Sequence, residues 1–437
     1  MTAAMSMPEE GSAELSLQRR RLVYSGVAGT AIEFYDFFLY GFMAPQVFDK
    51  LFFPKLDPLV ATLTVLATYG IGYGARPLGG ILFGHFGDRI GRKPVLFVTL
   101  ALMGVSSTLI GLLPTYGQIG IAAPIVLIIL RSLQGIALGG ESTGAPVLAM
   151  ESAPFGKRGG MAGLIQIGGA LGSLMASGAG SLATRLPPEQ FLDWGWRIPF
   201  IISFLLVGVG LYVRSRVSES PVFKRAIAAE PPEKVPVAAL FRRAKKPLAI
   251  VFTVALAESA MVNLFAVWGT YYGIAYAHID RGTMLSGILI GSVVGIVANP
   301  GFGRLTDFVG RRTVLIAGFV AGALWVAFAF FPLIATGDPA LVILAMAVPA
   351  GITQPMIFAV EASFYAECFD EARLRFSGAA LGRQLGNAIG GGTMPVVATA
   401  LLAASGSVTS PILYYAAISL ISVIAVLWAP ETNKKAI

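Results

Sequence analysis

The chain has 437 residues, of which 55% are hydrophobic and only 13% are charged, and its formal net charge is +8. Soluble globular proteins carry about 25% charged residues, so this composition excludes an ordinary cytosolic enzyme. Long apolar runs recur along the whole chain, and each crossing of a bilayer takes about 20 apolar residues. The sequence therefore predicts an all-α integral membrane protein.

The apolar runs predict twelve membrane-spanning helices, separated by glycine, proline and charged residues. The polar stretch through Arg21 lacks the short apolar core and the cleavage site of a signal peptide, so we expect the first run to stay as a span. The predicted spans are 23–48, 59–84, 95–113, 121–148, 160–183, 198–217, 247–276, 283–303, 312–334, 340–366, 377–403 and 410–429.

The basic residues indicate the orientation of these spans. Most of the 32 Lys and Arg residues fall into alternate loops on the side of both termini, and cytoplasmic loops carry such an excess. Positive charge that is dispersed over short loops does not indicate a nucleic-acid partner. We therefore expect a multi-pass membrane protein with both termini in the cytoplasm.

A long polar stretch, 218–246, lies at the middle of the chain and is rich in Pro, Glu, Lys and Arg. This composition is typical of a linker. The predicted organisation is a cytoplasmic tail (1–22), an N-terminal six-helix bundle (23–217), a cytoplasmic linker (218–246), a C-terminal six-helix bundle (247–429) and a second cytoplasmic tail (430–437).

The sequence offers little for covalent or metal chemistry. The one cysteine, Cys368, cannot form an intrachain disulfide, and His85 and His278 are too few for a histidine-built metal centre. There is no G-x-x-x-x-G-K-[ST] phosphate loop, and the loose G-x-G-x-x-A matches at 70–75 and 178–183 follow no strand. We expect no metal, no cofactor and no enzymatic activity, and we expect the energy to come from an ion gradient.

A glycine-rich loop with acidic and basic residues occurs twice. Residues 84–93 follow the second predicted span and residues 303–312 follow the eighth, half a chain later. Such repetition indicates a duplicated six-helix unit, whose halves can rock around a midplane site. A purely topogenic loop would explain the basic residues but not the paired Gly and Asp spacing. The predicted gating residues are Asp88, Arg89 and Arg92 in the first loop and Asp307 and Arg311 in the second.

The first loop, with the pattern G-x-x-x-D-R-x-G-R-[KR], resembles the signature of the major facilitator superfamily. The second loop has Phe308 where the family's first Arg stands, which weakens the ion pairing expected at the second gate. The resemblance implies twelve transmembrane helices in two pseudo-symmetric six-helix bundles.

Further motifs resemble the metabolite:proton symporter family within that superfamily. The stretch 51–141 looks most like members that carry shikimate, although relatives for 2-oxoglutarate, citrate, proline and betaine share much of the pattern. The motifs are Glu-Phe-Tyr-Asp-Phe at 33–37, Arg-Pro-Leu-Gly-Gly at 76–80, Arg131 with Gln134-Gly135, Trp-Gly-Trp-Arg-Ile-Pro at 194–199 and Glu-Ser-Pro at 219–221.

Two carboxyl groups lie in the first span. Charged residues within a membrane are costly and usually face the bundle interior or a partner. Glu33 and Asp36 share one helix face about a turn apart, where two poorly solvated carboxyls favour protonation of at least one. They are the predicted proton-coupling residues, and the alternative is a structural partnership with Arg76 or Arg131.

The fourth span carries Arg131, Gln134 and Glu141 on one stripe of the helix. A buried arginine can hold a carboxylate through a bidentate pair. We therefore predict that Arg131 and Gln134 bind substrate and that Glu141 takes part in gating. A permanent ion pair of Arg131 with Asp36 or Glu33 fits the pattern equally well.

The resemblance also implies which helices of the second half line the cavity, because in this superfamily the first and fourth helices of each half do so. On spans 7 and 10 the predicted substrate-binding residues are Glu258 and Gln354. Glu361 lies near the inner end of span 10 and is predicted to act in gating, as a latch for Arg311.

The eleventh span has glycines at strict four-residue spacing, at positions 378, 382, 386 and 390. Small residues at this spacing let helices approach closely, so we predict a packing seam. Arg383 and Asn387 interleave with the glycines and are predicted to add polar groups to the substrate cavity.

These observations predict a secondary active transporter that imports a small polar metabolite by proton symport, with an organic acid such as shikimate or another carboxylate as substrate. The alternative is a proton-coupled proline or betaine carrier; the chain stops seven residues after Pro430, without the long helical extension expected of osmosensing members. A sensor or membrane enzyme is a third class. The expected partners are the small molecule, protons and the lipid bilayer, and we expect a monomer.

Overall fold

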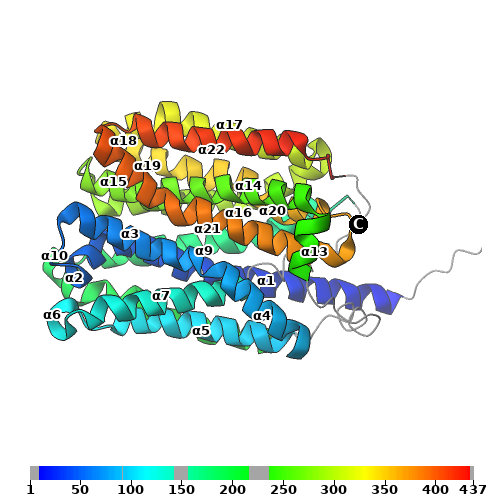
Figure 1. Cartoon of the computed structure of the whole chain (residues 1–437), viewed down its shortest axis with the longest axis horizontal. Coiled ribbons are helices and arrows are strands. Elements are labelled where there is room, and N and C mark those ends of the chain that lie inside the picture. The colour runs from blue at the N-terminus through cyan, green and yellow to red at the C-terminus, as the bar shows by residue number, and fades with distance from the viewer. Residues whose placement is uncertain (1–8, 91, 142–155, 216–235, 434–437) are drawn as a thin grey trace, which may run out of the picture.

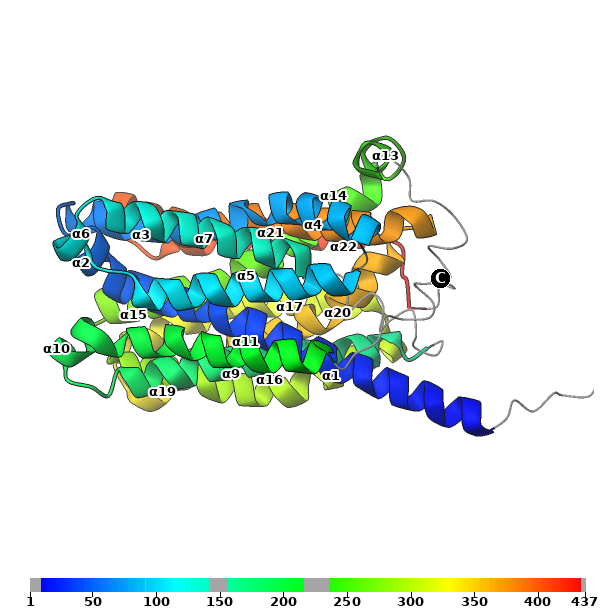
Figure 2. The same ribbon diagram turned by 90° about the horizontal axis from the view of Figure 1, so that it is seen from below.

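The computed structural model describes residues 9–90, 92–141, 156–215 and 236–433. Its long helices run side by side along one axis (Figures 1 and 2). Within the described residues, ten helices are long and apolar enough to cross a membrane, and the bent pair Pro188–Gly195 and Arg197–Tyr212 adds one when counted as a single span. The helix α1, Glu9–Met43, and the π-helical turn that follows it, Ala44–Phe48, lie at the first predicted span.

The first half consists of six spans joined by short turns. Several spans are built from two or three consecutive helical pieces, including π-helical turns. Its elements are α1 (Glu9–Met43), η1 (Ala44–Phe48), α2 (Asp49–Phe52), α3 (Pro58–Gly74), α4 (Arg76–Ile90), α5 (Arg92–Leu112), α6 (Tyr116–Ile119), α7 (Ala122–Glu141), α9 (Arg158–Ala183), α10 (Pro188–Gln190), η2 (Phe191–Gly195) and α11 (Arg197–Ser215).

The second half repeats this plan after the short helix α13. Its elements are α13 (Pro236–Arg243), α14 (Lys245–Val262), η3 (Asn263–Trp268), α15 (Gly269–Ala275), α16 (Arg281–Val309), α17 (Arg311–Trp325), η4 (Val326–Phe330), α18 (Phe331–Ala335), α19 (Pro339–Val348), η5 (Pro349–Thr353), α20 (Gln354–Glu367), α21 (Ala372–Ser405) and α22 (Thr409–Trp428). The part of the predicted linker that the structure describes thus contains a helix, α13.

The two halves form two stacked layers, the first in blue to green and the second in green to red (Figure 1). The helices α13 and α10 lie at opposite ends of the long axis (Figure 1), and we refer to these ends as the α13 end and the α10 end. Between the layers, α9 packs along α16 with backbones in close contact, because a Cβ at Gly163 would lie 2.5 Å from the carbonyl oxygen of Asn299. Gly159 and Gly303 face each other in the same way, so small residues hold the halves together.

The glycine seam predicted for span 11 lies inside the second half. A Cβ at Gly382 would lie 2.8 Å from the side chain of Val251, and Gly386 and Gly390 face the backbone of Phe252 and Leu256 on α14. Close helix packing needs small residues at such points. The seam therefore packs α21 on α14 and confirms the packing interpretation.

In the first half, the Trp-Gly-Trp-Arg-Ile-Pro motif joins α11 to its neighbours. Trp196 is fully buried against Phe48 and Phe200. Arg197 donates to the carbonyl oxygens of Gly111 (2.9 Å) and Leu113 (2.8 Å) at the end of α5, where helix carbonyls lack intrahelical partners. The motif thus fixes the ends of spans 3 and 6.

Candidate functional site

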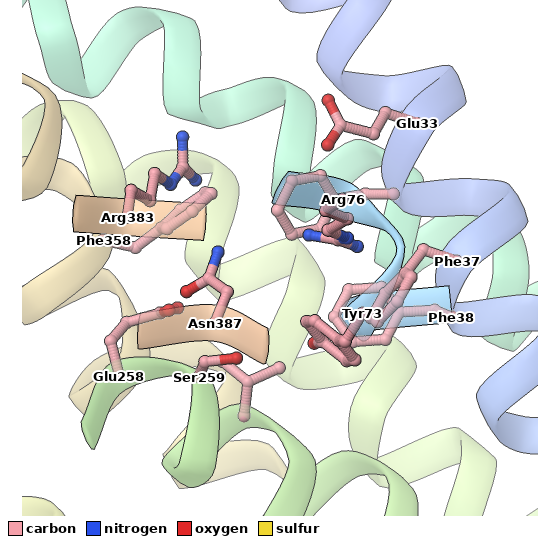
Figure 3. A pocket seen from close by; sticks show the side chains of 12 residues that line it. Glu33, Phe37, Phe38, Tyr73, Arg76, Glu258, Ser259, Phe358, Arg383 and Asn387 are labelled. Carbon is pink, nitrogen blue, oxygen red and sulfur yellow. The ribbon is translucent and has the colours of Figure 1, made fainter. Parts of the chain in front are cut away.

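A cavity lies between the two halves, and its atom-free space of about 420 Å³ includes open solvent. Figure 3 shows side chains from the two halves facing each other across it. The lining residues are Glu33, Phe34, Phe37, Phe38, Tyr73 and Arg76 from the first half and Glu258, Ser259, Val262, Phe358, Arg383 and Asn387 from the second.

Arg76 gives the first half its positive charge at the cavity. Pro77 follows it and, lacking an N–H, stands where the second span breaks into α3 and α4. The guanidinium lies over the rings of Phe37 (4.6 Å) and Tyr73 (4.4 Å), a stabilising arrangement for a cation. Among the described residues it has no acidic partner within 4.0 Å, and its Nε has no hydrogen-bond partner.

The charges of the second half form a cluster of three residues. The Arg383 guanidinium lies 3.8 Å from the carboxylate of Glu361, and the Tyr365 hydroxyl donates to the other oxygen of that carboxylate at 2.9 Å. Glu258 lies on the cavity wall beside them. In the described part of the chain, no lysine or arginine lies within 4.0 Å of the Glu258 carboxylate.

Hydrogen bonds join the halves next to the cavity. The Tyr69 hydroxyl donates to Asn263 Oδ1 at 2.7 Å, and Asn263 Nδ2 donates to the Tyr73 hydroxyl at 2.7 Å. Asn263 begins the π-helical segment η3, and such segments are frequent at functional sites. Gly391 of α21 packs on this group, since a Cβ there would lie 2.6 Å from the Tyr73 ring.

A second polar cluster lies behind the cavity, inside the first half. Asp36 accepts a hydrogen bond from Ser203, while Arg131 donates to Gln134 (2.8 Å) and Gln134 donates to Ser107. Ser107 also contacts the Asp36 carboxylate. These neighbouring polar side chains lie between Asp36 and Arg131, although one carboxylate oxygen of Asp36 has no hydrogen-bond partner.

Arg131 itself is 0% exposed and lies over the rings of Tyr40 (4.1 Å) and Tyr69 (5.0 Å). The close approach depends on Gly72, because a Cβ there would lie 2.5 Å from Arg131 Nε. Neither Asp36 nor Glu33 lies within 4.0 Å of this guanidinium in the described structure. The suggested direct ion pair of Arg131 is therefore wrong, and the link to Asp36 runs through Gln134 and Ser107.

The structure separates the predicted site residues into two groups. Glu33, Glu258, Arg383 and Asn387 meet at the cavity. The residues predicted to bind substrate that do not line it are Arg131, Gln134 and Gln354. Arg131 and Gln134 do not line the cavity because the face of α7 that carries them packs on α3 and α5. Asp36 lies one turn from Glu33 but points to Ser203.

Three polar lining residues were not among the predicted site residues: Arg76, Tyr73 and Ser259. For Arg76 a signal was available, because a charge inside a span and next to a proline is costly without a function. Tyr73 and Ser259 carry no such signal, since similar residues occur throughout the spans.

At the α13 end, Asp307 joins the two halves. Its carboxylate accepts hydrogen bonds from the backbone N–H groups of Gly159 and Gly160, both 3.0 Å, at the start of α9. Free N–H groups and the helix dipole favour an anion there. Arg311 donates to Asp307 (2.8 Å) and binds Glu367 (3.2 Å).

This network corrects two expectations. The ion pairing of the second loop does not depend on position 308, because Phe308 is 84% exposed and Arg311 makes the pairs. The carboxylate that latches Arg311 is Glu367, whereas Glu361, predicted for this contact, lies against Arg383. The side chains of the other predicted gating residues, Asp88, Arg89, Arg92 and Glu141, lie outside the described residues.

Comparisons with known proteins identify the family. The model of the "Sugar (and other) transporter" family matches residues 23–230, and that of the "Major Facilitator Superfamily" matches residues 290–437. The shikimate transporter of Escherichia coli (strain K12) is 36% identical over 438 residues, which cover 99% of each chain. The chain belongs to the major facilitator superfamily.

Other members of the superfamily place it more closely. The inner membrane metabolite transport protein YhjE of Escherichia coli (strain K12) is 36% identical over 96% of each chain. The proline/betaine transporter of the same strain is 34% identical over 69% of this chain and 62% of the relative. The chain is thus a transporter of the metabolite:proton symporter family and not an enzyme.

A solved structure shares the fold. The D-xylose-proton symporter superposes with a TM-score of 0.73 over 95% of this chain and 99% of that chain, at 17% identity. The protein is therefore a twelve-helix, multi-pass membrane protein with two six-helix bundles, as the sequence predicted.

Proposed function

We propose that this protein imports a small organic acid, shikimate or another carboxylate, together with protons and by alternating access. The observation that carries the proposal is the cavity between the halves, where Arg76 from one half and Arg383 from the other offer positive charge to an anion. The full-length similarity to a shikimate transporter supports an acid of this kind.

The groups that line the cavity match the chemistry of a ring-shaped hydroxy acid. Arg76 lacks an acidic partner, so it is the group that gains most by binding a carboxylate, through charge-assisted hydrogen bonds. The Asn387 Oδ1, which has no hydrogen-bond partner, can accept from a substrate hydroxyl. The aromatic rings of Phe37, Phe38 and Phe358 supply an apolar wall for the carbon skeleton.

For proton coupling in the first half we assign Glu33 and Asp36. Glu33 lines the cavity and can meet protons and substrate directly. Asp36 is enclosed, and Ser107 and Gln134 lie between it and Arg131. We therefore move Arg131 and Gln134 from substrate binding to this proton relay.

For gating we assign the Asp307 network at the α13 end. The two halves cannot separate there while Asp307 holds the first N–H groups of α9. Opening must break these hydrogen bonds, after which Asp307 keeps only its ion pair with Arg311. We place this end in the cytoplasm, with both termini, in the inner membrane of a bacterium, and we propose that a monomer suffices because the cavity is formed within one chain.

A proton-coupled carrier for proline or betaine is the second candidate. It is favoured by Glu258, which faces the cavity without a cationic partner within 4.0 Å among the described residues. A zwitterion could place its carboxylate at Arg76 and its quaternary ammonium near Glu258 and the aromatic rings, which attract such cations.

Counterflow in proteoliposomes tests the proposal and separates the candidates. Proteoliposomes that contain the purified protein are loaded in turn with unlabelled shikimate, 2-oxoglutarate, citrate, protocatechuate, proline or betaine. The same compound in labelled form is then added outside, and its entry is followed. We expect exchange of shikimate or another acid. Exchange confined to proline and betaine would establish the second candidate, and no exchange with any of the six would contradict both.

A further inference from the structure

We propose that Arg383 is shared between Glu361 and the carboxylate of the bound acid, so that substrate binding makes Glu361 take up a proton. This inference rests on the proposed function. It adds to it a coupling site in the second half, separate from Glu33 and Asp36, and it makes Arg383 the residue that links substrate to proton.

The first observation is how weakly Glu361 is held. Its side chain is 1% exposed, so water does not solvate it. One carboxylate oxygen accepts from Tyr365 at 2.9 Å, but the other oxygen has no hydrogen-bond partner and lies 3.8 Å from Arg383. That distance is too long for a hydrogen bond, so the charge of Glu361 depends on the electrostatic attraction of Arg383.

The second observation is a difference in access. Arg383 lines the cavity and its side chain is 13% exposed, whereas Glu361 does not line the cavity. An anion in the cavity can therefore contact Arg383 but not Glu361. Any effect of substrate on Glu361 must pass through Arg383.

The other charged groups around Glu361 do not replace this cation. Glu258 of α14 and Tyr365 of its own helix face it, and neither carries positive charge. Glu33 approaches Arg383 from the first half and adds a further negative charge. At this level α9, α16 and α17 present no ionisable side chain to Glu361 within the described ranges. A buried carboxylate that loses its cation is neutralised by a proton.

The charges then balance. Before binding, Arg383 carries one positive charge and Glu361 one negative charge, and the charges of Glu33 and Glu258 stay the same throughout the step. A carboxylate held between Arg76 and Arg383 draws the Arg383 guanidinium toward the cavity, and one proton then passes from the cavity by way of Glu258 to the unpartnered oxygen of Glu361. One anion and one proton have entered, with Glu258 on the cavity wall as the acidic group placed to pass the proton inward.

The test measures shikimate binding and proton uptake together, with the full-length protein in detergent and a weakly buffered indicator solution. In the wild type we expect about one proton per shikimate bound, and an affinity that falls about tenfold per pH unit on the alkaline side. In Glu361→Gln, which mimics the protonated state, we expect retained binding, no proton uptake and less than twofold change in affinity per pH unit.

Two further variants guard the interpretation. Glu189→Gln removes an exposed carboxylate outside the cavity and should behave as the wild type. Tyr365→Phe keeps Glu361 but removes its hydrogen-bond donor. Since phenylalanine has nearly the shape of tyrosine, this variant also tests the proposal if Glu361→Gln does not fold. Because the donor stabilises the ionised carboxylate more than the protonated one, the alkaline fall in affinity should begin at higher pH in Tyr365→Phe.

The outcomes separate the two proposals. Proton uptake that persists in Glu361→Gln, or a pH profile unchanged in Tyr365→Phe, would overturn the Arg383 exchange while leaving acid transport intact. Loss of proton uptake in Asp36→Asn together with its retention in Glu361→Gln would place coupling in the first half alone. A wild type that binds none of the acids would overturn the proposed function and this inference with it.

Discussion

Buried arginines of this transporter differ in whether an acidic side chain of the protein neutralises them. Arg311 has three partners, in Asp307, Thr306 and Glu367. Arg76 has only aromatic rings beneath it. Since an unpaired charge inside a membrane is costly, the residues that pay this cost are those where a ligand is expected to act.

Replacing Arg76 should therefore impair substrate binding more than folding. We expect Arg76→Gln to lower the affinity for shikimate about ten- to a hundredfold, because a hydrogen bond to a charged group contributes about 1.5–3 kcal/mol. Binding titration of the purified variants measures the effect. Arg185→Gln, at an exposed arginine, is the matched control, and equal affinities for the two variants would contradict the assignment.

The position of Arg131 gives a prediction about stability. Gly72→Ala would place a Cβ 2.5 Å from Arg131 Nε, whereas Gly74→Ala meets no atom within 4 Å. Overpacking of a buried site costs about 1–3 kcal/mol, so we expect a lower thermal midpoint in detergent for Gly72→Ala only. Similar midpoints for the two variants would show that Arg131 is free to move away.

At the scale of helices, the ends of the elements carry the gate. Asp307 on the α16 end satisfies the N-terminus of α9, and Gly310, with φ of 99°, turns the chain so that Glu431 can accept from the N–H of Arg311 at 2.8 Å. A helix end thus serves twice, as the limit of a span and as the contact between halves.

Breaking this contact should open the α13 end. Cys368 is buried directly after Glu367, which binds Arg311 in the same network as Asp307. We therefore expect Asp307→Asn to raise the labelling rate of Cys368 by a maleimide severalfold. The wild type contains one cysteine, so it reports without further changes. Asp338→Asn removes a cap of α19 at the other end of the molecule and should leave the rate unchanged; an equal increase in both variants would indicate general loosening.

Much of the helical organisation could be predicted from the sequence, because a span is a local property of apolar length. Polar and charged residues in the spans are visible in the sequence for the same reason, and Glu33, Glu258, Arg383 and Asn387 all line the cavity. What could not be predicted is which helix covers each face. Periodicity placed Arg131 and Gln134 on one stripe of α7, but only the packed structure shows that α3 and α5 cover that stripe.

At the scale of the whole molecule, the two halves enclose the cavity and the orientation decides from which side it is filled. The exposed basic residues Arg242, Arg243, Lys245 and Lys246 lie around α13, and such residues favour the cytoplasmic side. In a Cys368→Ala background, a membrane-impermeant maleimide added to intact cells should label Lys55→Cys near the α10 end but not Lys246→Cys. The reverse pattern would contradict the assigned orientation.

The most direct test of the account is the movement of protons during net uptake. Proteoliposomes that contain the wild-type protein receive shikimate outside, and external pH and internal shikimate are recorded together. We predict that the outside becomes alkaline as shikimate enters and that an imposed inward proton gradient drives accumulation, which a proton uncoupler abolishes. Shikimate accumulation that leaves the external pH unchanged and ignores the uncoupler would contradict proton symport.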